Sequence, residues 1–260
     1  MISGNQRIWL ILLFLAVIGC SESKWVIPQL EQRSSRHLYF ESDNGASLIA
    51  YKGFVVRYDT LHKVPAFTIQ HITPQQVSDS LGHKAQRKNV FWVDDKLEPF
   101  SATKADYYKS GYDRGHHAPA GDFVYSQALK DESFVFTNIS PQQPDLNRGA
   151  LVKLEKRIRE RIIHWQSEAY VITGTLFLKA PPDTIGEGLT VPSHIYKLVF
   201  YPQKKRMYAY IFPNYLKFYS DDLKRYRTTV DDIEIQCGED FFDRLADETE
   251  NKLESSKRNI

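Results

Sequence analysis

Residues Asp113 to His116 place a carboxylate, a guanidinium and an imidazole within four positions, and Gly115 separates Arg114 from His116. Alternate residues of an extended segment share a face, so Arg114 and His116 would point the same way and Asp113 the other way. A fixed positive charge beside a candidate general base suits phosphate esters. Because Pro119 interrupts regular pairing, we expect these side chains at a strand end.

A second polar stretch follows about thirty residues downstream, at the start of a predicted helix. Asn147 could give one neutral oxygen to Mg²⁺, with waters and a substrate phosphate completing the octahedron. Glu155, about two turns into the helix, could hold one of those waters. The structural alternatives stay open: Asn147 only caps the helix, Glu155 only forms surface ion pairs, and Asp113 with Arg114 is only an ion pair.

The elements that must position these residues are mostly short strands, recognised by apolar alternation and flanking turn residues. The sequence predicts strands at 50–58, 66–72, 134–139 and 169–174, and hairpins through 59–65 and between 195–201 and 207–212.

One helix is predicted over 150–164, because Leu154, Ile158 and Ile162 recur at helical spacing. Asp145 or Asn147 lies where an N-cap would be. Strands with a few helices predict an α+β fold with an antiparallel sheet core.

The N-terminal segment has the pattern of an export signal. Arg7 precedes an apolar run from Ile8 to Ile18, which is too short to span a bilayer but fits a signal-peptide core. Val17-Ile18-Gly19-Cys20 resembles the lipobox of bacterial lipoproteins, which predicts lipidation of Cys20 and membrane attachment through an N-terminal lipid anchor. Ordinary signal cleavage and a retained signal anchor are the alternatives.

The charge and cysteine counts exclude several classes of protein. With 34 basic and 32 acidic residues, the chain is not basic enough to coat nucleic acid, so contact with a polyanion must be local. Two cysteines, Cys20 and Cys237, allow no disulfide framework or cysteine zinc site, and Cys237 is expected to be a buried apolar filler. No His-Glu-x-x-His pattern supports a zinc hydrolase.

Asp113-Arg114-Gly115-His116, followed by Pro119-Ala120, resembles the signature of the DNA/RNA non-specific endonuclease family. These are the ββα-metal, or His-Me finger, nucleases that include mitochondrial endonuclease G. The likeness covers roughly residues 50 to 242. Leu151 stands where the family often has Trp, which we expect to alter packing and not chemistry. The further matched positions are Asn138, Pro141-Gln142, Leu146-Asn147, Gly149, Leu154-Glu155, Thr173-Gly174, Val191-Pro192 and Lys197.

The resemblance implies a ββα-metal finger and a role for each matched residue. His116 would be the general base that deprotonates the attacking water. Asn147 would be the single protein ligand of Mg²⁺, with Mn²⁺ as a substitute. Arg114 would bind the phosphate, and Glu155 would order metal-bound water. Asn138 would position the site near the base.

Two neighbours receive no catalytic role. Asp113 is expected to support the strand, and His117 is one residue out of phase with His116.

The activity implied is a sugar-non-specific endonuclease that hydrolyses DNA and RNA to 5′-phosphate and 3′-hydroxyl ends, through contacts to the phosphate backbone. The domain scheme is a signal peptide with lipobox at 1–20, a tether at 21–47, a nuclease domain at 48–245 and a charged, frayed tail at 246–260. The protein would be exported to the cell envelope. Its oligomeric state is left open, with a dimer as one option. Two alternatives are a catalytically silent surface nucleic-acid-binding protein and a small-molecule phosphodiesterase.

Overall fold

The computed structural model describes residues 38–41, 47–82, 85–243 and 245–258. The predicted signal peptide, Cys20 and most of the predicted tether lie outside the described residues. Within the described residues, no helix is both long and apolar enough to cross a membrane.

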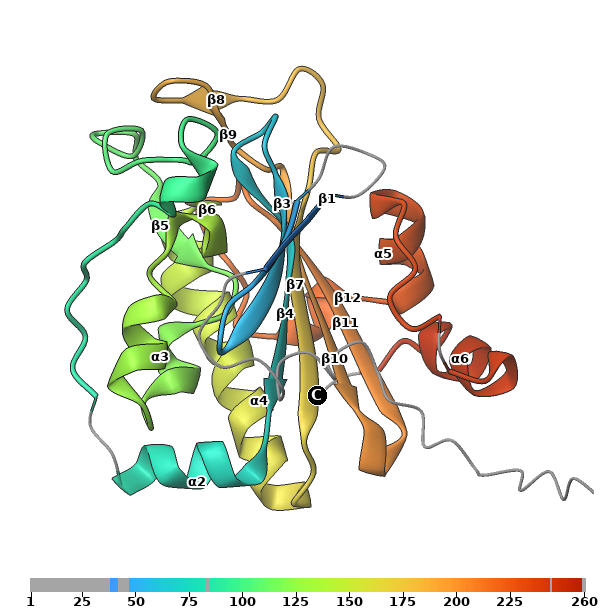
Figure 1. The fold of residues 1–260 in the computed structure, drawn as a ribbon. Coiled ribbons are helices and arrows are strands. Elements are labelled where there is room, and N and C mark those ends of the chain that lie inside the picture. The colour runs from blue at the N-terminus through green and yellow to red at the C-terminus, as the bar shows by residue number, and fades with distance from the viewer. Residues whose placement is uncertain (1–37, 42–46, 83–84, 244, 259–260) are drawn as a thin grey trace, which may run out of the picture.

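An eight-stranded sheet forms the centre of the fold (Figure 1). Its strands pair antiparallel throughout, which confirms the predicted α+β fold with an antiparallel core. In sheet order the strands are β1 (Leu38–Glu41), β2 (Ser47–Ala50), β3 (Phe54–Asp59), β4 (Val64–Ile72), β7 (Ala169–Leu176), β10 (His194–Tyr201), β11 (Arg206–Pro213) and β12 (Arg227–Thr228).

Two small hairpins and several helices surround this sheet. The hairpins are β5 (Asp113–His116) with β6 (Ile139–Gln142), and β8 (Thr184–Ile185) with β9 (Leu189–Thr190). The α-helices are α2 (Pro74–Gly82), α3 (Gln127–Glu132), α4 (Val152–Trp165), α5 (Val230–Cys237) and α6 (Asp247–Glu254). Short 3₁₀ helices lie at Asp95–Leu97, Ala120–Phe123, Phe136–Asn138, Pro202–Lys204 and Leu223–Tyr226, and a π-helical turn lies at Leu146–Leu151.

Helices cover both faces of the sheet, as Figure 1 shows: α4 lies on one side, and α5 and α6 lie on the other. Strand β10 illustrates why, because its alternate residues enter different cores. Ile195 and Val199 pack in the core that contains α4, whereas Leu198 and Phe200 pack with α5 and α6. Burial of each such side chain contributes about 1.5–3 kcal/mol to folding.

Several predicted strands are confirmed. The segment 66–72 lies in β4, and β3 and β4 form the hairpin predicted through 59–65. The hairpin of β10 and β11 is also confirmed. The strand predicted over 50–58 is interrupted, since β2 ends at Ala50 and β3 begins at Phe54.

Two strand predictions need correction. Residues 134–139 form a 3₁₀ turn at Phe136–Asn138, and β6 begins only at Ile139. All six are buried, so their apolar character reflects burial and not strand pairing. Strand β7 does not end at Gly174, since it continues to Leu176. The ring of Tyr196 fills the space that a side chain at Gly174 would need.

The predicted helix over 150–164 is confirmed as α4, but its start differs from the prediction. Leu151 is the N-cap residue of α4, and the π-helical turn precedes it. Asn147 lies inside that turn, where its side chain bonds to another element and caps nothing. Asp145 precedes the π-helical turn without a side-chain cap bond.

The two ends of the predicted domain are more ordered than expected. Strand β1 joins the sheet from within the predicted 21–47 tether. The tail predicted to be frayed at 246–260 contains α6, because Leu253 is buried in the core beside α5. Cys237 is half-buried and packs against the same core, close to its predicted role.

The close packing at Gly174 yields a stability prediction. A Cβ atom there would lie 2.1 Å from Cζ of Tyr196, whose side chain is fully buried and has no room to move. We expect Gly174→Ala to destabilise the protein by about 1–3 kcal/mol, measured by urea unfolding. Gly82→Ala is the control, since a Cβ atom added at Gly82 would meet nothing within 4 Å. Equal stability of the two variants would contradict this packing.

Candidate active site

The β5–β6 hairpin and α4 form a ββα finger beside the sheet (Figure 1). Asp113 pairs with Gln142 at one end of the hairpin, and His116 pairs with Ile139 at the other. Gly115 is required between them, because a Cβ atom there would lie 2.0 Å from Cδ of the fully buried Gln142. The hairpin then leads through the π-helical turn into α4, as the predicted ββα-metal finger requires.

Asp113 connects the hairpin to the π-helical turn. Its Oδ2 accepts hydrogen bonds from Asn147 Nδ2 at 2.8 Å and from Arg148 Nε at 2.7 Å, and its Oδ1 accepts one from an Arg148 terminal nitrogen at 2.5 Å. The amide of Asn147 is thereby oriented, and within the described residues its Oδ1 accepts no hydrogen bond. An amide oxygen is a suitable ligand for a hard cation. Asp113 therefore holds Asn147 of the π-helical turn and does more than support the strand, the role expected for it.

Arg114 and His116 share a face of β5, as their spacing predicted, and both contact Phe91. The Arg114 guanidinium carbon lies 4.3 Å from the centre of the Phe91 ring, and the His116 ring centre lies 5.7 Å from it. The ring of Phe134 meets the His116 ring edge-on, and the two ring centres lie 4.7 Å apart. Arg114 forms no ion pair with any described residue, so its charge is available to an anion.

Arg87 is a candidate that sequence reasoning missed. Its guanidinium carbon lies 5.2 Å from the centre of the Phe134 ring, whose edge-on partner is His116. Arg87 is exposed, and its Nε donates to Asn89 Oδ1 at 2.7 Å. No local pattern singles out this arginine, since it lies in an irregular segment about thirty residues before His116.

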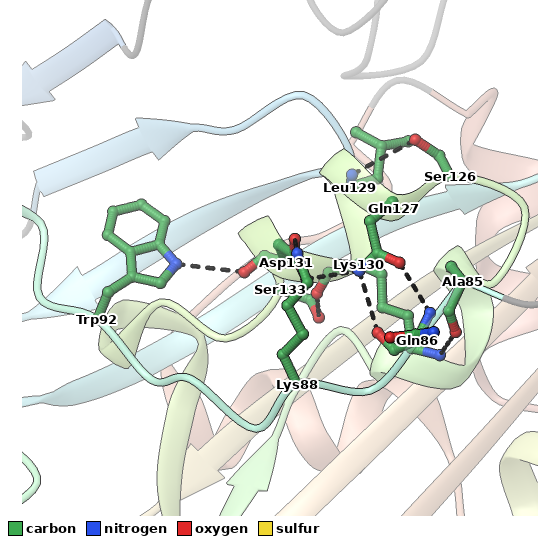
Figure 2. Close-up of polar contacts among 10 residues, drawn as sticks. All are labelled: Ala85, Gln86, Lys88, Trp92, Ser126, Gln127, Leu129, Lys130, Asp131 and Ser133. Carbon is green, nitrogen blue, oxygen red and sulfur yellow. Dashed lines mark hydrogen bonds and ion pairs between the residues drawn. The ribbon is translucent and has the colours of Figure 1, made fainter.

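The segment from Ala85 to Trp92, which carries Arg87 and Phe91, is attached to α3 (Figure 2). The nearly buried Lys130 donates from Nζ to the Ala85 carbonyl at 2.7 Å. Three further pairs of residues join the two elements. The Gln127 side chain accepts from the Gln86 backbone N–H at 2.7 Å and donates to the Gln86 carbonyl at 3.0 Å. Lys88 pairs with the Asp131 carboxylate at 2.7 Å, and Trp92 Nε1 donates to the Asp131 carbonyl at 3.2 Å. Helix α3 therefore fixes the position of Arg87.

The environment of His116 favours the neutral imidazole. Burial, followed by the positive charge of Arg87 and then of His117 and Arg114, lowers the pKa of His116 to about 3. Its Nε2 is buried and has no hydrogen-bond partner among the described residues. A neutral imidazole is the form that accepts a proton.

Asn138 is fully buried and bonds only to groups of the protein. Its amide accepts from the Ala118 backbone N–H and donates to the Ala118 and Ser133 carbonyls, each at 2.9 Å. These bonds fix the chain two residues beyond His116. Asn138 is therefore placed to position the segment that carries His116.

His117 has a separate structural position, in accord with its lack of a predicted catalytic role. Its ring nitrogens contact the Thr173 carbonyl at 3.0 Å and Ser140 Oγ at 2.9 Å, inside the protein. The ring therefore joins the finger to β7.

Glu155 lies in a buried group of charges between α4 and the sheet. Lys197 of β10, only 1% exposed, places its Nζ 3.7 Å from Glu155 Oε1. Burial raises the pKa of Glu155 to about 7, although Lys197 opposes the rise. Arg159 and the buried Asp122 form a neighbouring ion pair at 2.5 Å. The surface ion pair considered for Glu155 is thus not what forms.

Comparisons with known proteins agree with this finger. The model of the DNA/RNA non-specific endonuclease family matches residues 34–248. The chain belongs to this family. The matched residues include the β5–β6 hairpin, the π-helical turn, α4 and all eight strands of the sheet.

Curated relatives and a solved structure show the same likeness. Nuclease C1 of Cunninghamella echinulata var. echinulata is 34% identical over 211 residues, covering 75% of this chain and 82% of that protein. Human mitochondrial endonuclease G is 30% identical over 210 residues, with 74% and 68% covered. A crystal structure of the EndoG/EndoGI complex aligns with a TM-score of 0.66 and 28% identity, covering 76% of this chain and 86% of that one.

Human mitochondrial nuclease EXOG is another relative, 28% identical over 221 residues, which cover 77% of this chain. The match covers 58% of the length of human EXOG.

The state of His116 can be measured by NMR on the histidine-labelled protein. We expect its ring signals to stay constant between pH 8 and pH 5, because its pKa of about 3 keeps the imidazole neutral there. In urea the same ring should titrate near about 6.5, the value of an unperturbed histidine. The signals are assigned with His116→Gln. A midpoint above pH 5.5 in the folded protein would show that the ring is not desolvated in this way.

Proposed function

We propose that this protein is a metal-dependent endonuclease that hydrolyses phosphodiester bonds of both DNA and RNA. The observation that supports this most strongly is the Asp113 contact with Asn147, which presents a free amide oxygen beside the hairpin that ends in a neutral His116. Asp113, which holds Asn147, and His116 are the first and last residues of the four-residue strand β5.

His116 acts as the general base. Its Nε2 is buried away from solvent, which leaves Nδ1 as the ring nitrogen that would receive the proton of the attacking water. The aromatic rings of Phe91 and Phe134 hold the imidazole in place while it acts.

The residues present fit a hard divalent cation at Asn147. The free Oδ1 of Asn147 would hold Mg²⁺, or Mn²⁺ in its place, with waters and substrate oxygens as the remaining ligands. When bound, the cation stabilises the charge that develops on the phosphate and the leaving oxygen. Glu155, in the first turn of α4, would accept hydrogen bonds from water at the site, and Lys197 opposes its protonation.

Arg114 and Arg87 bind the phosphate from the aromatic side of the site. Both guanidinium groups lie over phenylalanine rings next to His116, so both carry charge toward the same position. Contacts of this kind read the backbone and not the bases, so neither sugar nor sequence is selected. The products are 5′-phosphate and 3′-hydroxyl ends.

Nicking of plasmid DNA and cleavage of RNA in the presence of Mg²⁺ test this proposal. We expect wild-type cleavage that EDTA abolishes, and a loss of about 10²–10⁴-fold in His116→Ala, the usual contribution of a general base. Asn147→Ala should lose activity in the same range at low Mg²⁺, with partial recovery at higher concentrations.

The matched control is His164→Ala, which removes an exposed histidine at the far end of α4 and should leave cleavage unchanged. Full activity of His116→Ala would refute the assigned chemistry. Binding of nucleic acid that EDTA does not affect, with no cleavage by the wild type, would instead identify a catalytically silent binding protein. Cleavage of small phosphodiesters without cleavage of polymers would identify a small-molecule phosphodiesterase.

We also propose that the protein is exported and anchored in the cell envelope by a lipid on Cys20. The support is the apolar run from Ile8 to Ile18 and the small residue directly before this cysteine. Expressed in a bacterial host, the full-length chain should enter the detergent phase in Triton X-114 partitioning, and Cys20→Ala should enter the aqueous phase. Cys237→Ala, the control, should behave as the wild type. Wild-type protein in the aqueous phase would contradict lipidation.

A further inference from the structure

Helices α5 and α6 carry three carboxylates that converge on one point. Asp231 and Glu234 belong to α5, and Glu254 is the last residue of α6. One oxygen of each carboxylate lies within 4.8 Å of the corresponding oxygens of the other two. Residues about twenty positions apart in the sequence thus meet at one place between two helices.

Glu254 provides a separate observation that indicates a missing ligand. It is more than nine-tenths buried, since only 6% of the residue is exposed, and its Oε1 has no hydrogen-bond partner among the described residues. The burial is explained by its neighbour Leu253, which packs in the core. A buried carboxylate oxygen without a donor is costly, so native proteins pair such atoms or coordinate them to metals.

Among the described residues, no side-chain cation pairs with this group. None of the three carboxylates takes part in an ion pair within the described part of the chain. Glu234 Oε1 accepts only the Phe241 backbone N–H, at 2.9 Å. Each of these features favours a bound positive charge.

We propose that Asp231, Glu234 and Glu254 bind a divalent cation of the calcium class, which joins α6 to α5. The ligands are all oxygens, which excludes the soft metals that prefer thiolate or imidazole. Ca²⁺ takes several carboxylate ligands in a flexible geometry, and the three oxygens lie close enough together, within 4.8 Å of one another, to share one such ion. Mg²⁺ usually keeps several waters and binds through only one or two carboxylates.

This site is distinct from the candidate active site. Helices α5 and α6 pack on the face of the sheet opposite α4, which follows the turn containing Asn147 (Figure 1). The cation would hold α6 onto the core through Glu254 and take no part in hydrolysis. The inference therefore does not depend on the proposed function.

Thermal unfolding of the full-length protein tests the site. The background is Asn147→Ala, which removes the proposed ligand of the other metal. After treatment with EDTA and dialysis, addition of 1 mM CaCl₂ at pH 7.5 should raise the Tm of this variant by about 5 °C. Adding Glu254→Gln or Glu234→Gln to the background should abolish the rise. Adding Glu248→Gln, the same chemical change at an exposed position of α6, should preserve it.

Calorimetric titration gives a second measurement on the same proteins. We expect one Ca²⁺ bound per chain in Asn147→Ala and at least tenfold weaker binding after Glu254→Gln. Asp231→Asn keeps the test valid if one glutamate variant fails to fold. Absence of a Tm shift and of heat in the Asn147→Ala background would overturn the proposal, because the carboxylates would then be neutralised by protons. Unchanged Ca²⁺ binding in the glutamate variants would also overturn it, since the ion would lie elsewhere.

Discussion

The contact between Asp113 and the π-helical turn determines the geometry of the finger. A single carboxylate, at the start of the strand that ends in His116, bonds to both Asn147 and Arg148. The hydrogen bonds of a π-helical turn span five residues, one more than those of an α-helix. Such bulges occur often at functional sites. Without this carboxylate, the amide of Asn147 would have no fixed orientation relative to the hairpin.

The rest of the protein supports this contact from several directions. His117 joins the hairpin to β7, and Asn138 fixes the chain just beyond His116. The buried pair of Glu155 and Lys197 lies beneath α4, where the loss of either partner would leave an uncompensated charge. These contacts tie the site residues to the folded core.

Most of the fold and the main site residues could be predicted from the sequence, and the failures have physical causes. The α+β class, the main hairpins and α4 follow from apolar periodicity, which depends on local burial. The strand predicted at 134–139 failed because a fully buried 3₁₀ turn has the same composition as a strand. Arg87 escaped notice because its place beside His116 depends on tertiary contacts with α3, which leave no local pattern.

Because the Ala85–Trp92 segment is attached to α3, the position of Arg87 is set separately from the position of His116. The hairpin carries His116 and the π-helical turn carries Asn147, whereas a short helix of six residues outside the finger controls where Arg87 lies. Substitutions in α3 could therefore move Arg87 without changing the hairpin that carries His116. Under the proposed phosphate contact of Arg87, substitutions in α3 would change the salt dependence of nucleic-acid binding.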